Sequence, residues 1–445
     1  MAAEADGTLR RVLRFRDLVV YGLLFIAPMA PVGVFGTLDA TSHGAVALVY
    51  VVATVAMAFT AYSYAQMVRV APVAGSVFTY ARLGLGESAG FVAGWMALLD
   101  YLLIPAVAYL FSGIAMEALV PAVDRWVWTA IAVVITTGLN LWGVRAAALA
   151  GLLVLAMEIA VLIVFVSAAV VQLAAHGARR DWVSPFTGQG PFSASAVLAA
   201  VSVAVLSYLG FDAIASFAEE TTSTAWVARA VLTCLVVAGL LFVVQTYLAA
   251  LLAPMSAAEL AAEPARQGSA FYDTVDAAVG SWLHDLVAFS KAVGAAFAAL
   301  AGQAAAGRLL FAMGRDRRLP PVLAEVGGRS GVPARALVVA ALVTLVAAVW
   351  AARSDEGLVR LVSIVAIGAL SAFTLLHASV IGWFWVRRHA DHPHVVRHVV
   401  VPLLGMGVTV AVMVEASGVA QAVGAVWLAV GLVVLLAEFR RGTTG

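Results

Sequence analysis

The sequence contains 445 residues, of which 63% are hydrophobic and 11% charged, and its formal net charge is +1. This composition excludes a soluble globular domain, and the balanced charge gives no basis for nucleic-acid binding. Apolar runs of about 20 residues recur along the chain, long enough to cross a bilayer as helices, whereas a β-barrel would show short alternating segments. The first apolar run is too long for a signal-peptide core, so no cleaved signal is expected.

The apolar runs predict an all-α, multi-pass membrane protein with twelve transmembrane helices. In chain order they cover residues 17–41, 44–68, 88–118, 126–143, 148–173, 194–219, 227–254, 277–306, 334–352, 358–386, 397–415 and 419–437. No joint between them is long enough for a soluble domain. Segments 69–87 and 307–333 are rich in Gly, Pro and Arg, and we expect short surface helices there.

The distribution of arginine predicts how the chain is oriented in the membrane. With a cytoplasmic N-terminus, 19 arginines fall in or beside inner segments and 6 in or beside outer segments. Because cytoplasmic loops carry an excess of positive charge, both termini, 1–16 and 438–445, are expected in the cytoplasm. The predicted location is the inner (plasma) membrane, with the lipid bilayer as the surroundings of the spans.

Two of the predicted spans contain residues that interrupt a helix. The first span reads Ala-Pro-Met-Ala-Pro-Val-Gly-Val-Phe-Gly at 27–36, and the sixth reads Ser-Tyr-Leu-Gly-Phe-Asp at 207–212. Proline lacks the N–H that a helix needs, and glycine weakens a helix interior. Such breaks persist in a membrane where they line a cavity, so a pair of them indicates a transporter's binding site. For the first span alone, a structural proline kink is the alternative.

The two breaks lie five spans apart, which is the separation that an inverted five-plus-five repeat requires. The first repeat then covers residues 17–173 (spans one to five), and the second covers 194–386 (spans six to ten). Residues 397–437 form two appended spans. The repeat is inferred from the spacing of the breaks.

The broken helices expose backbone groups that could hold a small charged molecule. The N–H groups near Val34, Phe35 and Gly36 suit a carboxylate, and the carbonyls near Ala27 and Ser207 suit an ammonium. The predicted substrate-binding residues within the breaks are Ala27, Met29, Gly33, Val34, Phe35, Gly36, Ser207, Tyr208, Gly210, Phe211 and Asp212.

Three motifs point to a family. They are Pro-Val-Ala-Gly-Ser-Val-Phe-Thr-Tyr at 72–80, Leu-Gly-Phe-Asp at 209–212 with Glu-Glu-Thr at 219–221, and Arg-Leu-Leu-Phe-Ala-Met-Gly-Arg-Asp at 308–316. In these motifs the sequence resembles the amino acid/polyamine/organocation (APC) permeases. The resemblance implies the leucine-transporter fold, with the substrate held between the broken helices and spans three and eight.

Within that family, two stretches are most similar to bacterial putrescine importers. They are Gly-Trp-Met-Ala-Leu-Leu-Asp-Tyr-Leu-Leu-Ile-Pro at 94–105 and the Ala-Pro-Met that opens the first break. The sequence departs from the importers at Gly33, where the resemblance implies an aspartate. A carboxylate useful for a diamine is therefore absent, which weakens the putrescine interpretation.

Two acidic residues inside spans, Asp100 and Asp212, are candidate contacts for a substrate amine. An aspartate at the bilayer centre costs about 2.5–3.5 kcal/mol on insertion scales, so such residues face the interior and usually serve a function. The alternative for Asp212 is to cap the restarted helix. The alternative for Asp100 is an interaction with a neighbouring helix.

Glu158 in span five and Lys291 in span eight are a second candidate pair, for proton coupling. The resemblance implies that these spans flank a sodium position in sodium-coupled relatives, and that proton-coupled relatives carry a span-five basic residue there instead. Segment 292–307 contains no Ser or Thr, which argues against such a sodium site. Burial disfavours the charged form of each group, whereas the partner charge favours it, so changing water access could move a proton. A static buried pair is the alternative.

Other residues are given structural interpretations. Tyr208 and Phe211 could cover the substrate, with packing between helices as the alternative, and Trp95 is expected to pack. Cys234 is expected to be a small buried residue. His377 is expected to be hydrogen-bonded in the interior, and the histidines at 389, 392, 394 and 398 to form a polar loop rather than a metal site. No nucleotide-binding or hydrolase motif is present, so neither an enzyme nor a cofactor is expected.

These patterns predict a secondary active transporter that imports a small amino acid or polyamine by proton symport, with alternating access around the two breaks. The expected partners are the small-molecule substrate and a proton, with the protein as a monomer or homodimer and no nucleic acid. A transporter-like sensor without net transport is the alternative. A purely structural membrane subunit is disfavoured, because it has no need for broken helices and charges within the membrane.

Overall fold

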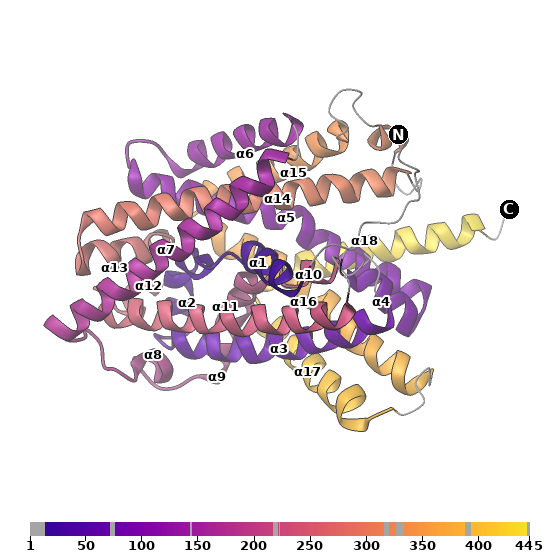
Figure 1. Ribbon diagram of the computed structural model, residues 1–445, viewed down its shortest axis with the longest axis horizontal. Helices are drawn as coiled ribbons and strands as arrows, with labels where there is room; N and C mark the ends of the chain where they lie inside the picture. Colours follow the sequence, from indigo (N-terminus) through magenta and orange to yellow (C-terminus); the bar gives the residue numbers. More distant parts are fainter. Residues whose placement is uncertain are drawn as a thin grey trace.

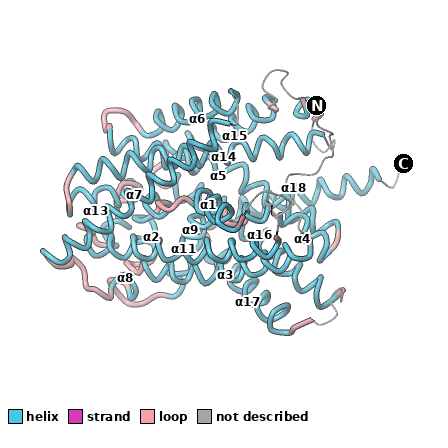
Figure 2. The backbone as a smooth tube through the Cα atoms, in the orientation of Figure 1, coloured by secondary structure: helices cyan, strands magenta, loops and turns pink. Residues whose placement is uncertain are grey.

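The computed structural model describes residues 14–71, 76–142, 145–216, 221, 223–315, 320–325, 333–387 and 393–442. Figure 1 shows long helices packed together, with α1 near the centre of the view and α18 leading to the C-terminus at one edge. Short loops join the helices (Figure 2). Parts of several sequence motifs, at 72–75, 219–220, 316, 389 and 392, lie outside the described residues, as do most of the predicted N-terminal tail and residues 443–445.

The described chain contains ten helical stretches that are long and apolar enough to cross a membrane. Two shorter apolar stretches, Arg125–Leu141 and Ala194–Tyr208, stand where the fourth and sixth spans were predicted. The predicted all-α, twelve-span fold is thereby confirmed. The division into repeats at 17–173 and 194–386 stays a prediction.

The helices follow the predicted spans closely. Those up to residue 176 are α1 (Phe15–Ile26), α2 (Phe35–Thr41), α3 (Val46–Val70), α4 (Ser76–Leu85), α5 (Glu87–Leu119), α6 (Arg125–Trp142) and α7 (Arg145–His176). The later ones are α8 (Ser184–Thr187), α9 (Ala194–Ala204), α10 (Ala213–Ser216), α11 (Thr224–Leu252), α12 (Ala257–Ala262), α13 (Ala270–Ala278), α14 (Ser281–Arg315), α15 (Ala334–Ala352), α16 (Gly357–Ile381), α17 (Val401–Glu415) and α18 (Gly418–Gly442).

One boundary differs from the sequence prediction for a clear physical reason. Span eight was predicted at 277–306, but α13 ends at Ala278 and α14 starts at Ser281. Gly280 between them has a φ of +118°, a conformation that a residue with a side chain rarely adopts. The chain therefore turns at Gly280, and α14 continues past the predicted end of the span.

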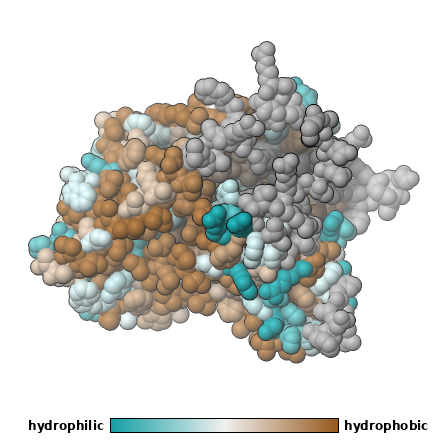
Figure 3. Space-filling model, in the orientation of Figure 1, coloured by the Kyte–Doolittle hydropathy of each residue, from teal (hydrophilic) through white to brown (hydrophobic). Residues whose placement is uncertain are grey.

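The outer surface of the bundle is apolar, as a lipid environment requires. Figure 3 shows hydrophobic residues over most of the described surface on the visible face. Large apolar side chains on the outer helices are strongly exposed, for example Val346 at 69% and Leu153 at 65%. In a soluble protein such surfaces would be covered, so the pattern supports membrane-facing helices.

The interior is built around α5 and α14, which pack against each other. Helix α16 covers α5, and α11 packs along α3. The appended helix α18 is joined to α5 by Trp95 and Trp427, whose rings stack 4.8 Å apart and whose indole nitrogens each donate to the other's carbonyl oxygen. Trp95 is therefore a packing residue, as predicted.

Candidate substrate and coupling site at the helix breaks

The first span is broken in the structure where the sequence predicts it. Helix α1 ends at Ile26, a 3₁₀ turn covers Ala30–Gly33, and α2 starts at Phe35. Ala27 has a φ of 57°, which is unusual for a residue with a side chain. The carbonyl oxygen of Ala27, predicted as a contact for an ammonium, accepts a hydrogen bond from the N–H of Ala30 at 2.9 Å.

Side chains from other helices satisfy the next two carbonyls of this break. Gln245 of α11 donates from Nε2 to the carbonyl oxygen of Pro28 at 3.0 Å. Lys291 of α14 donates from Nζ to the carbonyl oxygen of Met29 at 3.1 Å. Backbone carbonyls freed in a membrane need such partners. The break is thus held from two sides, by a neutral amide and by an ammonium.

Lys291 is completely enclosed. Its residue is 3% exposed, and its Nζ lies 5.0 Å from the centroid of the Phe111 ring, within the range of a cation–π interaction. A Cβ added to Gly33 would lie 2.5 Å from Cδ1 of Phe111, so this ring sits directly against the backbone of the first break. The absence of a side chain at Gly33 leaves the space that Phe111 occupies beside the lysine.

Glu158 of α7 lies next to the same part of α14. It is 3% exposed, and a Cβ added to Gly294, one turn along from Lys291, would lie 2.2 Å from its Oε1. The charges of Glu158 and Lys291 interact electrostatically, yet Lys291 makes its hydrogen bond to Met29. Among the described residues, Oε1 of Glu158 has no hydrogen-bond partner. The two groups are neighbours in the buried interior, and the ammonium is hydrogen-bonded to the broken helix.

The sixth span is broken as well. Helix α9 ends at Ala204, a 3₁₀ turn covers Val205–Tyr208, and α10 starts at Ala213. Gly210 has a φ of +109°, and a Cβ there would lie 2.9 Å from the carbonyl oxygen of Phe25 in α1. The two breaks therefore touch near this glycine.

Asp100 and Asp212 lie near each other across the interior. They are 8% and 9% exposed, and their carboxyl groups are close enough to repel electrostatically. Asp212 accepts hydrogen bonds from the N–H of Gly210 at 3.2 Å and from the hydroxyl of Tyr101 at 3.4 Å. Within the described part of the chain, Oδ1 of Asp100 has no partner. Two buried carboxyl groups of this kind form an acidic centre that a cation would stabilise.

The side chains of three other predicted residues of the sixth span contact α3. Ser207 Oγ lies 2.9 Å from the hydroxyl of Tyr50 in α3. The hydroxyl of Tyr208 lies 2.7 Å from Oγ1 of Thr54, also in α3. The ring of Phe211 is fully buried and makes an edge contact with that of Tyr64, at 5.9 Å. Their side chains connect the broken helix to α3. Their role in binding a substrate stays a prediction.

The remaining predicted residues of the first break lie beneath a loop. Val34 donates from its N–H to the carbonyl oxygen of Pro31 at 3.1 Å. The ring of Phe35 makes an edge contact with that of Phe271 at 5.7 Å. A Cβ added to Gly36 would lie 2.3 Å from the carbonyl oxygen of Gln267. The start of α2 is therefore covered by the segment between α12 and α13.

The predicted interior positions of His377 and Cys234 are confirmed, whereas His398 was wrongly predicted in a polar loop. It lies in the helical turn Val396–Val400, is 6% exposed and stacks on the ring of Phe384 at 4.1 Å. His377 is fully buried, and its ring nitrogens lie 2.8 Å from Ser63 Oγ and 3.3 Å from Thr60 Oγ1. Cys234 is buried, as predicted. Across the described residues, no group of three or more His, Cys, Asp or Glu side chains could hold a metal ion.

Gln245 and Phe111 are parts of the site that the sequence reasoning did not identify. Gln245 is a polar residue within an apolar span and is fully buried, with its Oε1 unpaired among the described residues. A polar side chain in a membrane helix is a signal that could have drawn attention to it. Phe111 carries no such signal, because an aromatic residue in an apolar span is ordinary.

Replacement of Gly210 by alanine is expected to destabilise the protein. The positive φ and the nearby Phe25 carbonyl both oppose a Cβ at this position, with a cost of about 1–3 kcal/mol. The measurement is the thermal unfolding midpoint in detergent, which should fall. Gly407→Ala is the matched control, because a Cβ there meets no atom within 4 Å. An equal midpoint in both variants would contradict the described geometry of the sixth break.

Residues 18–414 match the family model described as amino acid permease, and the chain belongs to this family. Its membrane-spanning helices and its family together make it an integral membrane transporter rather than an enzyme. The resemblance seen in the sequence motifs is thereby confirmed.

Individual relatives are similar over most of the chain. The low-affinity putrescine importer PlaP of Escherichia coli K12 is 28% identical over 438 residues, which cover 96% of this chain and 93% of that protein. The branched-chain amino acid permease BcaP of Bacillus subtilis is 26% identical over 475 residues, covering 99% and 95%. The vacuolar cationic amino acid transporter 2 of Arabidopsis thaliana is 28% identical over 394 residues, covering 82% and 59%.

Proposed function

We propose that this protein is a proton-coupled secondary transporter that imports a small amino acid or polyamine across the plasma membrane. The substrate binds at the two breaks, which the helix bundle exposes alternately to each side of the membrane. The excess of arginine in the predicted inner segments supports cytoplasmic termini. With that orientation, the joints after α2, α7 and α11 lie outside.

The contact between Lys291 and the Met29 carbonyl is the observation that carries the coupling proposal. A broken membrane helix presents carbonyl oxygens that a bound cation can satisfy. Here an ammonium of the protein itself meets one of these oxygens, so a sodium ion is not needed at that carbonyl. This arrangement supports coupling to a proton instead of sodium.

Glu158 supplies the second group that proton coupling requires. Its carboxyl group is buried, with no hydrogen-bond partner for Oε1 among the described residues, and lies near a lysine that is bonded to the first break. When the break rearranges and water enters, the balance between desolvation and attraction to Lys291 changes. Such a change would load a proton on one side of the membrane and release it on the other.

The acidic centre of Asp100 and Asp212 favours a substrate that carries an amine. The named substrates of the relatives include a diamine and branched-chain and cationic amino acids, all of which contain one. Gly33 adds no carboxylate for a second amine, and Lys291 places a positive charge beside the first break. These features favour a substrate with a single amine near the acidic centre. We therefore favour an amino acid over a diamine as the substrate.

Neutralising the acidic centre is expected to weaken substrate binding. A hydrogen bond to a charged group contributes about 1.5–3 kcal/mol, so Asp100→Asn and Asp212→Asn should each raise the Kd by about 10-fold or more. Asp285→Asn is the control, because its side chain is 65% exposed on α14. Unchanged affinity in both interior variants would remove the acidic centre from the substrate site.

The identity of the substrate and the occurrence of transport can be tested together. Purified protein in liposomes is loaded with putrescine, arginine or a small neutral amino acid, and counterflow of labelled substrate is measured with each as competitor, at acidic and neutral pH. Exchange with one of these compounds is expected. Binding without counterflow would contradict transport and favour a ligand sensor.

A further inference from the structure

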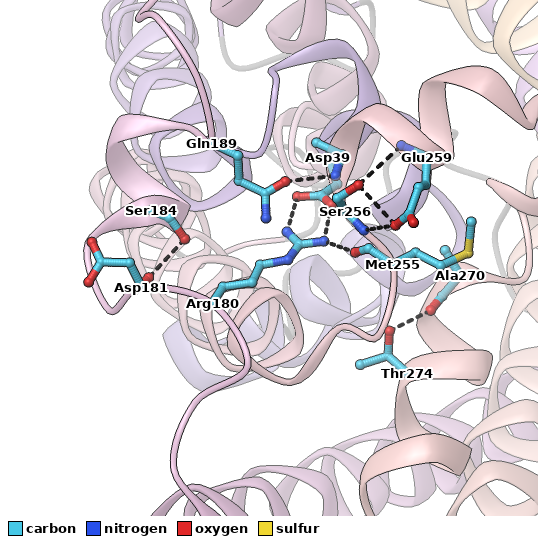
Figure 4. A network of polar contacts seen from close by, with 11 residues as sticks. Asp39, Arg180, Asp181, Ser184, Gln189, Met255, Ser256, Glu259, Ala270 and Thr274 are labelled. Carbon is cyan, nitrogen blue, oxygen red and sulfur yellow. Dashed lines mark hydrogen bonds and ion pairs between the residues drawn. The ribbon is translucent and has the colours of Figure 1, made fainter.

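A buried ion pair lies near the end of α2. Arg180, in the joint between α7 and α8, donates from Nη1 to Asp39 Oδ1 at 2.9 Å and from Nη2 to Oδ2 at 2.8 Å (Figure 4). The side chains are 5% and 0% exposed. Such a bidentate ion pair fixes the orientation of both side chains, because the guanidinium and carboxylate planes must match.

The same arginine holds a third segment. Its Nη2 also donates to the carbonyl oxygen of Met255, in the joint between α11 and α12 (Figure 4). A single side chain therefore joins α2, the α7–α8 joint and the α11–α12 joint. These three segments can separate only if the arginine releases at least one of them.

A second set of contacts, made by Gln189, joins neighbouring parts of the chain. The N–H of Gln189, which follows α8, donates to the carbonyl oxygen of His43 at 2.8 Å, just beyond α2. The side-chain oxygen of Gln189 accepts from the N–H of Ala257 at 2.7 Å, at the start of α12. We refer to the contacts of Arg180 and Gln189 together as the α2 clasp.

The helix that the α2 clasp holds is buried along most of its length. Thr37 in α2 is 1% exposed, and the backbone at Gly36 is in close contact with Gln267. The cavity left between Phe35 and Met255 measures about 10 Å³, which is at the lower limit for a single water molecule. A substrate approaching the first break from this side must therefore displace α2 or the loops tied to it.

We propose that Arg180 is a gating residue, which closes the extracellular path to the first break by tying α2 to the two neighbouring loops. This inference rests on the proposed transport function and orientation. Nε of Arg180 has no partner among the described residues, so the pair is incompletely hydrogen-bonded. A buried ion pair with an unsatisfied donor repays its desolvation poorly, which suits a contact that must open in every cycle.

The test measures how often the covered face of α2 becomes accessible. Cys234 is the only cysteine, so Cys234→Ala gives a background in which Thr37→Cys places a single buried thiol in α2, two residues before Asp39. A membrane-impermeant thiol reagent is added outside intact cells, and the labelling rate is measured with Arg180 and Asp39 intact, with Arg180→Gln and with Asp39→Asn. Because labelling requires no substrate, its outcome is independent of proton coupling.

The expected result is slow labelling with the clasp intact and labelling about tenfold faster in each clasp variant, since couplings of this kind change populations by about 5- to 150-fold. Arg179→Gln is the matched control. It removes the neighbouring arginine charge, whose Nη2 donates to the Ala277 carbonyl at 2.7 Å, and should leave the rate unchanged. Ser195→Cys, exposed at the start of α9, should label rapidly in every background.

Two results would overturn the proposal. One is an unchanged labelling rate of the Thr37→Cys thiol when Asp39→Asn is added. Asp39→Asn keeps the shape of the side chain, so this result would count against the gate even if Arg180→Gln does not fold. The other is labelling of the Ser195→Cys thiol only after the membrane is permeabilised. The clasp would then face the cytoplasm and could not close an extracellular path. If the clasp variants label faster but the wild-type protein shows no counterflow, the gating proposal would stand and the proposed transport function would be contradicted.

Discussion

Lys291→Met is expected to reduce the initial rate of uptake by about 100-fold or more. Removing one partner of a buried charged contact costs about 3–5 kcal/mol, because the remaining groups stay buried without compensation. The Met29 carbonyl loses its side-chain donor, and Glu158 loses the charge beside it. The measurement is uptake in proteoliposomes, normalised to the amount of folded protein determined by size-exclusion chromatography.

The matched control for this variant is Gln303→Met on the same helix. Gln303 is fully buried and lies about three turns from Lys291, and its side chain is hydrogen-bonded to Asn140 of α6 at 3.1 Å. Gln303→Met should lower the unfolding midpoint while pH-driven uptake persists. If the Lys291→Met variant took up substrate at the same rate as the Gln303→Met variant, Lys291 would have only a structural role.

Glu158→Gln is expected to separate exchange from accumulation. The amide keeps the shape of the side chain but cannot take up or release a proton at this site. Counterflow between equal substrate pools should therefore persist, whereas accumulation driven by an inside-alkaline pH gradient should disappear. Both are measured in the same proteoliposome preparation, so a folding defect would show as the loss of both.

The opposite pattern for Glu158→Gln would be decisive. If the variant still accumulated substrate in response to the pH gradient, Glu158 would not carry the coupled proton. A variant in which both activities fell by the same factor would assign the residue to helix packing against Gly294. Wild-type protein and Glu158→Asp, which retains a titratable group, serve as references.

The spans and both breaks could be predicted from the sequence because each depends on local chemistry. Long apolar runs have one stable form in a bilayer, and proline and glycine act on the helix that contains them. The spacing of the breaks also led to the predicted inverted repeat, which stays a prediction. The turn at Gly280 was missed, since the apolar pattern continues through it.

The side-chain directions at the site could not be predicted in the same way. Ser207 and Tyr208 belong to the sixth break, but their hydroxyls point to α3, which the sequence separates from them by more than 150 positions. Gln245 meets Pro28 over a separation of 217 positions, and Arg180 meets Asp39 over 141. Such contacts depend on the relative rotation of packed helices and on loop paths, which a single sequence does not encode locally.

The central claim is that a proton, and not sodium, drives uptake through the site at the two breaks. The most direct test is accumulation of the exchanged amino acid or amine by wild-type protein in liposomes, under a pH gradient alone and under a sodium gradient alone. Accumulation with the inside-alkaline pH gradient, and no response to sodium, is the predicted result. Accumulation that requires sodium and ignores pH would contradict the assignment of Lys291 and Glu158.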